Sequence, residues 1–390
     1  MRDAMFNFSA LPPLSLYIHI PWCVRKCPYC DFNSHEAKNT IPQDEYIAAL
    51  IADLEQELPA VWGRSIESIF IGGGTPSLLA PSAIDRLLSE IRARLPYKPG
   101  IEVTLEANPG TWEYGKFREF RDAGVNRLSL GIQSFDTGML GRLGRIHGPD
   151  EAFAAAESAR KAGFDNFNLD LMFGLPGQSV AQALTDIGHA IALNPAHISL
   201  YQLTLEPNTA FHTHPPRLPE DEAIWEMQEK CQEQLAIHGY RQYEVSAYAQ
   251  PGRECRHNLN YWQFGDYLGI GAGAHGKISD AQHQRISRAW KVKHPRDYLA
   301  KAATPERIGG ASQLTRTDAG FEFMMNALRL TDGFPVALFA QHTGLPITTV
   351  KSGLQQAEAK GFIAWDIQTI RPTELGKRFL NEVLEIFLPG

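Results

Sequence analysis

Between residues 14 and 205 the sequence alternates short apolar runs, rich in β-branched residues, with amphipathic stretches. Six runs have the length and composition of strands: residues 14–20, 68–71, 102–107, 127–132, 166–172 and 197–203. Helical periodicity marks the five stretches between them: residues 44–58, 84–95, 116–123, 150–162 and 181–193. Strands that alternate with helices form a parallel sheet covered by those helices. The pattern therefore predicts an α/β fold, with a partial (β/α)6 barrel as its core.

Gly-rich, Pro-rich or polar clusters follow three of the predicted strands directly, at residues 72–76, 107–110 and 174–177. In barrels and open parallel sheets, the loops after the carboxyl ends of the strands build the ligand site. We therefore expect these clusters to lie on one face of the molecule and to surround its functional site.

The chain of 390 residues is longer than a single hydrophobic core supports. We divide it into an N-terminal extension (1–16), the barrel core (17–215), a segment that extends the barrel (216–305) and a C-terminal unit (306–390). In the last unit, helical patterns precede strands near residues 361–369, and a final helix begins at Thr373. This order is typical of a small winged-helix-like α+β domain.

The net charge and the number of cysteines indicate which partners and which compartment suit this protein. There are 37 Lys and Arg against 44 Asp and Glu, a net charge of -7, which argues against nucleic acid as a partner. Residues 1–10 lack the apolar run of a signal peptide or membrane anchor. The chain has five cysteines, an odd number, and three of them lie within eight residues, which favours a metal site in a reducing compartment over disulfides. We therefore predict a cytoplasmic protein.

The three clustered cysteines, Cys23, Cys27 and Cys30, have the spacing C-x3-C-x2-C and follow the first predicted strand. Three thiolates can ligate three irons of a [4Fe-4S] cluster and leave the fourth iron open to a small chelating ligand.

Two other sites fit the same residues. His35 could complete a zinc site with the three thiolates, although zinc sites usually pair C-x2-C with a distant second pair. Alternatively, Cys231 or Cys255 could supply the fourth ligand of a purely structural cluster.

The segment Tyr17-Ile-His-Ile-Pro-Trp-Cys23, with the loops downstream, resembles the coproporphyrinogen-oxidase-like group of radical-SAM proteins over nearly the whole chain. The resemblance implies a TIM-type radical-SAM barrel, a [4Fe-4S] cluster and S-adenosylmethionine (SAM), whose amino and carboxylate groups would chelate the open iron. It also implies the SAM contacts, which are Tyr17, Tyr29, Gly73, Gly74, Thr75, Glu106, Gln133, Arg145 and Asp170. Glu106 would accept hydrogen bonds from the ribose hydroxyls, and the triple glycine would offer amides to the SAM carboxylate.

Taken alone, some of these residues have ordinary structural explanations. Arg145 could form a surface ion pair and Asp170 could cap a helix, whereas Gln202 and His275 match the family pattern less clearly. The run Gly271-Ala-Gly-Ala-His-Gly276 fits G-x-G-x-x-G, but we reject it as a dinucleotide motif because no convincing helix follows it. In the resembling family this run approaches the SAM pocket.

Two features distinguish the branches of this family. The coproporphyrinogen oxidases carry a further cysteine after the third ligand, where this chain has Asp31 and Phe32. The segment His257-Asn-Leu-Asn-Tyr-Trp262 matches the H-N-x-x-Y-W motif of the HemW heme chaperones. A neutral imidazole is a good axial ligand for heme iron, and aromatic neighbours supply apolar surface for a porphyrin.

The resemblance thus implies heme as a third cofactor, with His257 as its axial ligand, and a chaperone that delivers heme to acceptor hemoproteins, among them membrane-bound respiratory enzymes. No coproporphyrinogen oxidation is expected, but oxygen-independent coproporphyrinogen III dehydrogenase is the alternative. Read without the family, the motif around His257 would more often be a hydrogen-bonded structural element. The sequence leaves open whether Cys255 ligates heme in place of His257 and whether the chain forms a homodimer.

Overall fold

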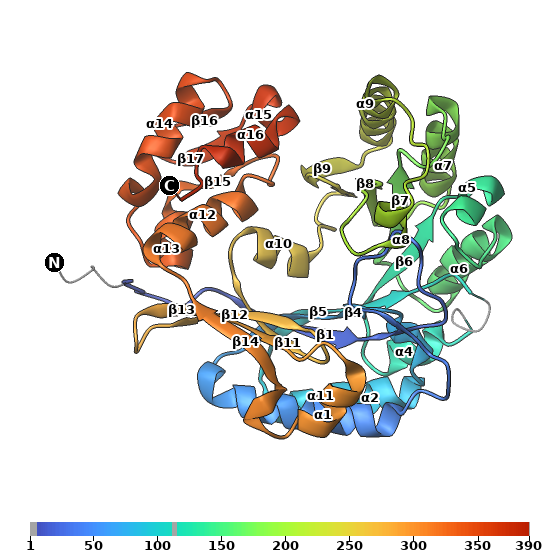
Figure 1. Ribbon diagram of the computed structural model, residues 1–390, viewed down its shortest axis with the longest axis horizontal. Coiled ribbons are helices and arrows are strands. Elements are labelled where there is room, and N and C mark those ends of the chain that lie inside the picture. Colours follow the sequence, from blue (N-terminus) through green and yellow to red (C-terminus); the bar gives the residue numbers. More distant parts are fainter. Residues whose placement is uncertain (1–5, 111–114, 390) are drawn as a thin grey trace.

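A computed structural model describes residues 6–110 and 115–389, so the first five residues of the predicted N-terminal extension lie outside the described residues (Figure 1). Six parallel strands form its centre: β1 (Leu14–Ile20), β4 (Ile66–Gly73), β5 (Tyr97–Ala107), β6 (Arg127–Gln133), β7 (Phe167–Phe173) and β8 (His197–Gln202). Neighbours in the chain are neighbours in the sheet. The six predicted strands and the α/β class are therefore confirmed.

Helices cover the outer face of these strands, as the periodicity predicts (Figure 1). The five predicted helices are α1 (Gln43–Glu57), α2 (Pro81–Arg94), α4 (Phe117–Asp122), α6 (Pro149–Lys161) and α7 (Val180–Ala192). A further short helix, α5 (Thr137–Arg142), follows β6 and was not predicted. In α1 the buried side chains of Tyr46, Leu50 and Leu54 recur every four residues, so they form one stripe against the sheet. A capping box of Ser179 and Gln182 begins α7.

The sheet continues beyond the parallel strands at both edges. Next to β1 lie β11 (Asp266–Ile270), β12 (His275–Asp280), β13 (Arg285–Lys291) and β14 (Ile308–Gln313), and next to β8 lie β10 (Ala247–Ala249) and β9 (Arg241–Glu244). Of these added strands, β11 is parallel to its neighbour β1, and the others pair in antiparallel fashion. The sequence analysis assigned residues 306–390 to the C-terminal unit, and this range includes the edge strand β14. In the structure, however, β14 pairs with β13 and so belongs to the large sheet.

Further elements lie between these strands along the chain. They are β2 (Trp22–Cys23), β3 (His35–Glu36), α8 (Ala210–Thr213), α9 (Asp221–Ile237), α10 (Arg256–Trp262) and α11 (Pro295–Lys301). Residues 271–274 of the Gly-rich run form the turn between β11 and β12, and the run ends in the strand β12, so no helix follows it, as expected.

The C-terminal unit contains α12 (Arg316–Ala327), α13 (Val336–Thr343), α14 (Lys351–Ala359), α15 (Glu374–Arg378) and α16 (Leu380–Glu385) around a small sheet of β15 (Phe334–Pro335), β17 (Thr369–Pro372) and β16 (Ile363–Trp365). It has its own hydrophobic core, which also takes in Phe6 and Phe8 from the N-terminal segment and Leu259 and Trp262 from α10. The helix α10 therefore joins the barrel to the C-terminal unit.

Within residues 6–110 and 115–389, no helix combines the length and the apolar character that crossing a bilayer requires.

Candidate functional site

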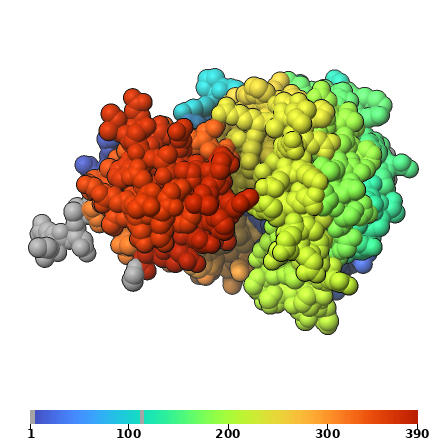
Figure 2. Space-filling model, turned by 90° about the horizontal axis from the view of Figure 1, so that it is seen from above, coloured from blue at the N-terminus to red at the C-terminus, as the bar shows by residue number. Residues whose placement is uncertain are grey.

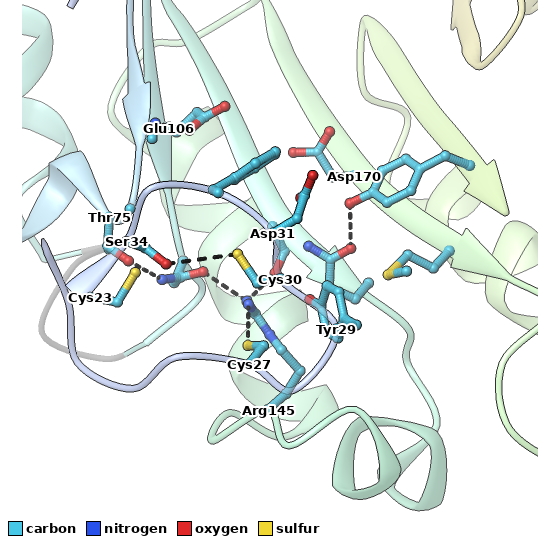
Figure 3. Close-up of a pocket in the computed structure, with 18 of the residues that line it drawn as sticks. Cys23, Cys27, Tyr29, Cys30, Asp31, Ser34, Thr75, Glu106, Arg145 and Asp170 are labelled. Carbon is cyan, nitrogen blue, oxygen red and sulfur yellow. Dashed lines mark hydrogen bonds between the residues drawn. The ribbon is translucent and has the colours of Figure 1, made fainter. Parts of the chain in front are cut away.

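The loop after β1 brings the three clustered cysteines to the carboxyl end of the parallel strands. All three thiols are free and half-buried, and all three line one pocket with a volume of about 440 Å3. Figure 3 shows the cysteines on this loop, with Arg145 beside Cys27 and with Glu106 and Asp170 farther along the pocket. The predicted convergence is thus confirmed for the clusters at residues 72–76 and 107–110, which both contribute to this pocket, whereas none of residues 174–177 lines it.

The surroundings of the sulfurs combine partial burial with a nearby cation. Burial raises the pKa of the Cys23 and Cys30 thiols. The Arg145 guanidinium lies 3.8 Å from the Cys27 sulfur, and the Ser34 hydroxyl lies 3.8 Å from the Cys30 sulfur. Thiols bind metals as thiolates, so a cationic iron cluster and the guanidinium would both favour deprotonation here.

The donor set fits an iron-sulfur cluster better than a zinc ion. His35 does not line the pocket, and its ring packs against that of His294, with 5.4 Å between the ring centroids. In the part of the chain that the structure describes, no three His, Cys, Asp or Glu side chains are gathered closely enough to hold a single metal ion. Cys231 and Cys255 are fully buried and line other parts of the interior. The three loop cysteines thus line one pocket together, and neither Cys231 nor Cys255 lines it, which fits a cluster with three protein ligands.

The glycines after β4 are needed for close packing, but their amides are not free for a ligand. Gly73 has φ of +115°, and a Cβ there would lie 2.5 Å from the His19 ring. The Gly73 amide donates to Glu106, and the amides of Gly74 and Thr75 donate to the carbonyls of Ile20 and Trp22. The prediction that these amides bind the SAM carboxylate is therefore wrong for this conformation, because the Cys loop and Glu106 already use them. Gly73, Gly74 and Thr75 still line the pocket.

Two half-buried carboxyl groups, Glu106 on β5 and Asp170 on β7, face the pocket. Burial, together with the nearby Asp170 carboxylate, raises the pKa of Glu106 to about 8. Burial also raises the pKa of Asp170, although this side chain accepts hydrogen bonds from Ser129 (2.9 Å) and Asn168 (2.8 Å). Such groups can accept hydrogen bonds from hydroxyls or amines of a ligand, and a cationic ligand would favour their ionised forms.

Arg145 and Gln133 are held in the pocket wall by hydrogen bonds. The Arg145 Nη2 donates to Asn108 (2.7 Å) and to the Gly131 carbonyl (2.5 Å), so the surface ion pair considered from the sequence is not its role. Gln133 has a left-handed backbone with φ of +68°, and its side chain accepts a hydrogen bond of 2.7 Å from Tyr201. The side chains that would contact a ligand are therefore positioned by the protein itself.

Of the predicted SAM contacts, all but Tyr17 line the pocket. Tyr17 lies deeper in the barrel, where its hydroxyl makes a 2.9 Å hydrogen bond with His19. Gln202 lines the pocket, whereas His275 is exposed and stacks on Trp290.

The pocket residues that sequence reasoning missed include Ser129, Met172 and Tyr201. Ser129 and Gly131, and likewise Asp170 and Met172, are two residues apart on their strands and line the same pocket. The alternation of side chains along a strand was a signal that could have found them.

His257 does not line this pocket. It lies in the first turn of α10, is only 6% exposed, and its Nδ1 lies 3.0 Å from the Ser68 hydroxyl. Burial lowers its pKa to about 3, so the imidazole is neutral. Its ring lies 5.1 Å from that of Phe70 and 6.5 Å from that of Tyr17, measured between centroids. The residue thus occupies the barrel interior, next to the Tyr17 side chain that reaches His19.

The other residues of this motif hold α10 between the two cores. Asn260 donates hydrogen bonds of 2.9 Å to Ser15 and to the carbonyl of Asp266. Leu259 and Trp262 pack against the C-terminal core. Cys255 lies 3.5 Å from a Glu102 carboxyl oxygen, and burial raises its pKa to about 12, which keeps it a thiol. In this conformation the motif is a structural junction whose histidine is inaccessible from outside.

Comparison with known proteins relates the whole chain to one family. Residues 17–187 match the Radical SAM superfamily, and residues 314–379 match the HemN C-terminal domain. A protein of Escherichia coli (strain K12) named heme chaperone HemW is 51% identical over 97% of this chain and 99% of its own length. A protein of the same name from Bacillus subtilis (strain 168) is 37% identical over 96% of this chain and 99% of its own.

The solved structure of coproporphyrinogen III oxidase (HemN) from Escherichia coli, a radical SAM enzyme, has the same fold. Its TM-score is 0.81 at 23% identity, over 97% of this chain and 90% of that one. At this identity the likeness concerns the fold alone.

Proposed function

Since the chain belongs to the HemW family of heme chaperones, within the radical-SAM superfamily, we propose that it binds heme and delivers it to acceptor hemoproteins, among them membrane-bound respiratory enzymes. Membership of the superfamily implies a [4Fe-4S] cluster and SAM. The five free cysteines support a reducing compartment, and we place the protein in the cytoplasm.

The pocket lined by Cys23, Cys27 and Cys30 would hold the cluster and SAM. When bound, this pair supplies one-electron chemistry at the SAM sulfonium. The protein would orient SAM through Glu106 and Asp170, which accept hydrogen bonds, and through Arg145, which is fixed by Asn108 and Gly131. Neither of the two positions after Cys30 is a cysteine, and Asp31 and Phe32, which stand there, line the pocket. This difference from the coproporphyrinogen oxidases supports a role other than porphyrinogen oxidation.

The observation that carries the heme proposal is the environment of His257. Its Nδ1 is paired with Ser68, and its pKa of about 3 keeps the ring neutral, as iron ligation requires. We propose that Nε2 is the axial ligand. Because the ring is buried, heme can reach it only when α10 separates from β4, so heme binding should be accompanied by opening of the barrel at α10.

The test is an anaerobic heme titration of the reconstituted protein, followed by the Soret band. His257→Ala should lose the Soret shift while the cluster absorbance is retained, and added imidazole should restore the shift by filling the vacated position. His238→Ala, which removes an exposed histidine at the end of α9, is the matched control and should bind heme normally. Full heme binding by His257→Ala without imidazole would remove the axial-ligand assignment. Formation of protoporphyrinogen from coproporphyrinogen, SAM and a reductant would overturn the chaperone function.

A further inference from the structure

A cleft of about 480 Å3 separates α9 from the C-terminal unit, and we propose that it receives the carboxylate-bearing edge of the heme. The inference rests on the proposed heme binding and assigns a site for the propionates. Among the residues that line this interlobe cleft are Trp225, Glu229, Leu328, Arg329, Lys377 and Arg378. Figure 2 shows the C-terminal unit in red meeting the α9 region in yellow-green along a seam.

The cleft combines apolar surface with cations. Trp225 and Leu328 provide the apolar walls, and Arg329, Lys377 and Arg378 are three cations that line the same space. Heme is a flat apolar ring with two carboxylates on one edge, so it needs both kinds of surface. A volume of a few hundred Å3 is typical of small-molecule sites.

The cations at the rim are held by contacts that a ligand can replace. The Arg378 guanidinium lies 4.1 Å from the centroid of the Trp225 ring and makes a 3.2 Å ion pair with Glu229. The side chains of this ion pair are 47% and 54% exposed. Exposed ion pairs contribute little stability, about 0–1 kcal/mol. A porphyrin carboxylate could therefore take the place of Glu229 on Arg378 at low cost.

Arg329 connects the cleft to the helix that carries His257. Its guanidinium lies 4.3 Å from the centroid of the Trp262 ring, at the end of α10, and its Nη2 lies 3.3 Å from a Glu244 carboxyl oxygen. Its Nε has no hydrogen-bond partner among the described residues, and the same is true of the Trp262 Nε1. A half-buried guanidinium with an unused donor is suited to a carboxylate, which binds arginine through two parallel hydrogen bonds.

Alternatively, Arg329 and Arg378 could serve only to hold the α9 region and the C-terminal unit together. Another ion pair between these two parts of the chain provides a control for this alternative. Arg241 and Asp332 form a 2.6 Å ion pair between β9 and the C-terminal unit, yet neither residue lines the cleft. If the arginines only hold the two lobes together, loss of Arg241 should have the same effect as loss of Arg378. If they bind propionates, only the residues of the cleft should matter.

The experiment compares heme with heme dimethyl ester, which lacks free carboxylates, in anaerobic titrations of the full-length reconstituted chain. We expect Arg378→Gln and Arg329→Gln each to weaken heme binding about tenfold or more, since each removes a charge-assisted hydrogen bond. Both variants should bind the ester as the wild type does, and Arg241→Gln should bind both ligands normally.

Unchanged heme affinity in Arg378→Gln and Arg329→Gln would overturn the propionate site and leave the proposed function standing. An equal loss of affinity for heme and for heme dimethyl ester would also overturn the propionate site, because the arginines would then not recognise the carboxylates. Arg378 is exposed at the rim, so its variant remains informative if Arg329→Gln folds poorly. Absence of heme binding in the wild type would instead refute the proposed function, together with this inference.

Discussion

Replacement of Glu106 by glutamine should make the protein more stable at alkaline pH and remove much of its pH dependence. In the folded chain, burial and the nearby Asp170 raise the pKa of Glu106 to about 8, whereas its usual value is 4.5. The folded state therefore keeps this carboxyl protonated over a range in which the unfolded chain releases the proton. The stabilising contribution is full below pH 4.5, declines as the pH rises, and is lost above pH 8.

The size of the effect follows from the same two values. At about 1.4 kcal/mol for each pH unit, the loss between the unfolded and folded pKa values is at most about 5 kcal/mol. Because Glu106 lines the open pocket and is partly exposed, solvent screening reduces our expectation to about 3 kcal/mol. Glutamine can still accept the hydrogen bond from the Gly73 amide but cannot ionise.

Urea unfolding of the cluster-free chain, followed by tryptophan fluorescence at pH 5 and pH 8.5, measures this difference. Wild type and Glu106→Gln should be similar at the lower pH, and the variant should be about 3 kcal/mol more stable at the higher pH. Glu206→Gln, which changes a carboxylate of the same pocket, should keep the wild-type pH dependence. The reasoning is refuted if Glu106→Gln loses stability between the two pH values as steeply as the wild type.

Three further results are expected. Asp266→Asn removes the carboxylate 2.9 Å from the buried Lys277 ammonium and should cost about 3–5 kcal/mol in urea unfolding; a cost below about 1 kcal/mol would show that the charge is otherwise compensated. Gly73→Ala places a Cβ 2.5 Å from the His19 ring and should destabilise the chain by about 1–3 kcal/mol, so an unchanged melting temperature would contradict the packing argument. Cys27→Ser should prevent stable assembly of a four-iron cluster, and wild-type iron and sulfide content would rule out Cys27 as a ligand.

Much of the barrel could be predicted because its signals are local. The first strand begins at Leu14 and ends at Ile20, as predicted, and the other five strands were found with shifts of a few residues at their ends. The cysteine spacing and the loops after the strands pointed to one pocket, since parallel strands bring their carboxyl ends to one edge. The edge strand β14 was misplaced because nothing in its six residues indicates which sheet it joins.

The details of the site depend on contacts between distant parts of the chain. The amides after β4 are occupied by the Cys loop and Glu106, which no local pattern reveals. Tyr17 is the first residue of the family motif 17–23, but its side chain points toward His19 and the barrel interior and does not line the pocket. The amides and the Tyr17 hydroxyl thus make hydrogen bonds within the protein in place of the ligand contacts that were predicted for them.

The sequence by itself determined the α/β class, the close spacing of three cysteines and the presence of a histidine among aromatic residues, because periodicity, spacing and residue type can be read along the chain. Only the tertiary structure decided that α10 is packed between two cores, with His257 against Ser68 and Trp262 beneath Arg329. Those partners lie more than sixty residues away from the motif in sequence, and it is the packing of the whole sheet and of the C-terminal unit that brings them together.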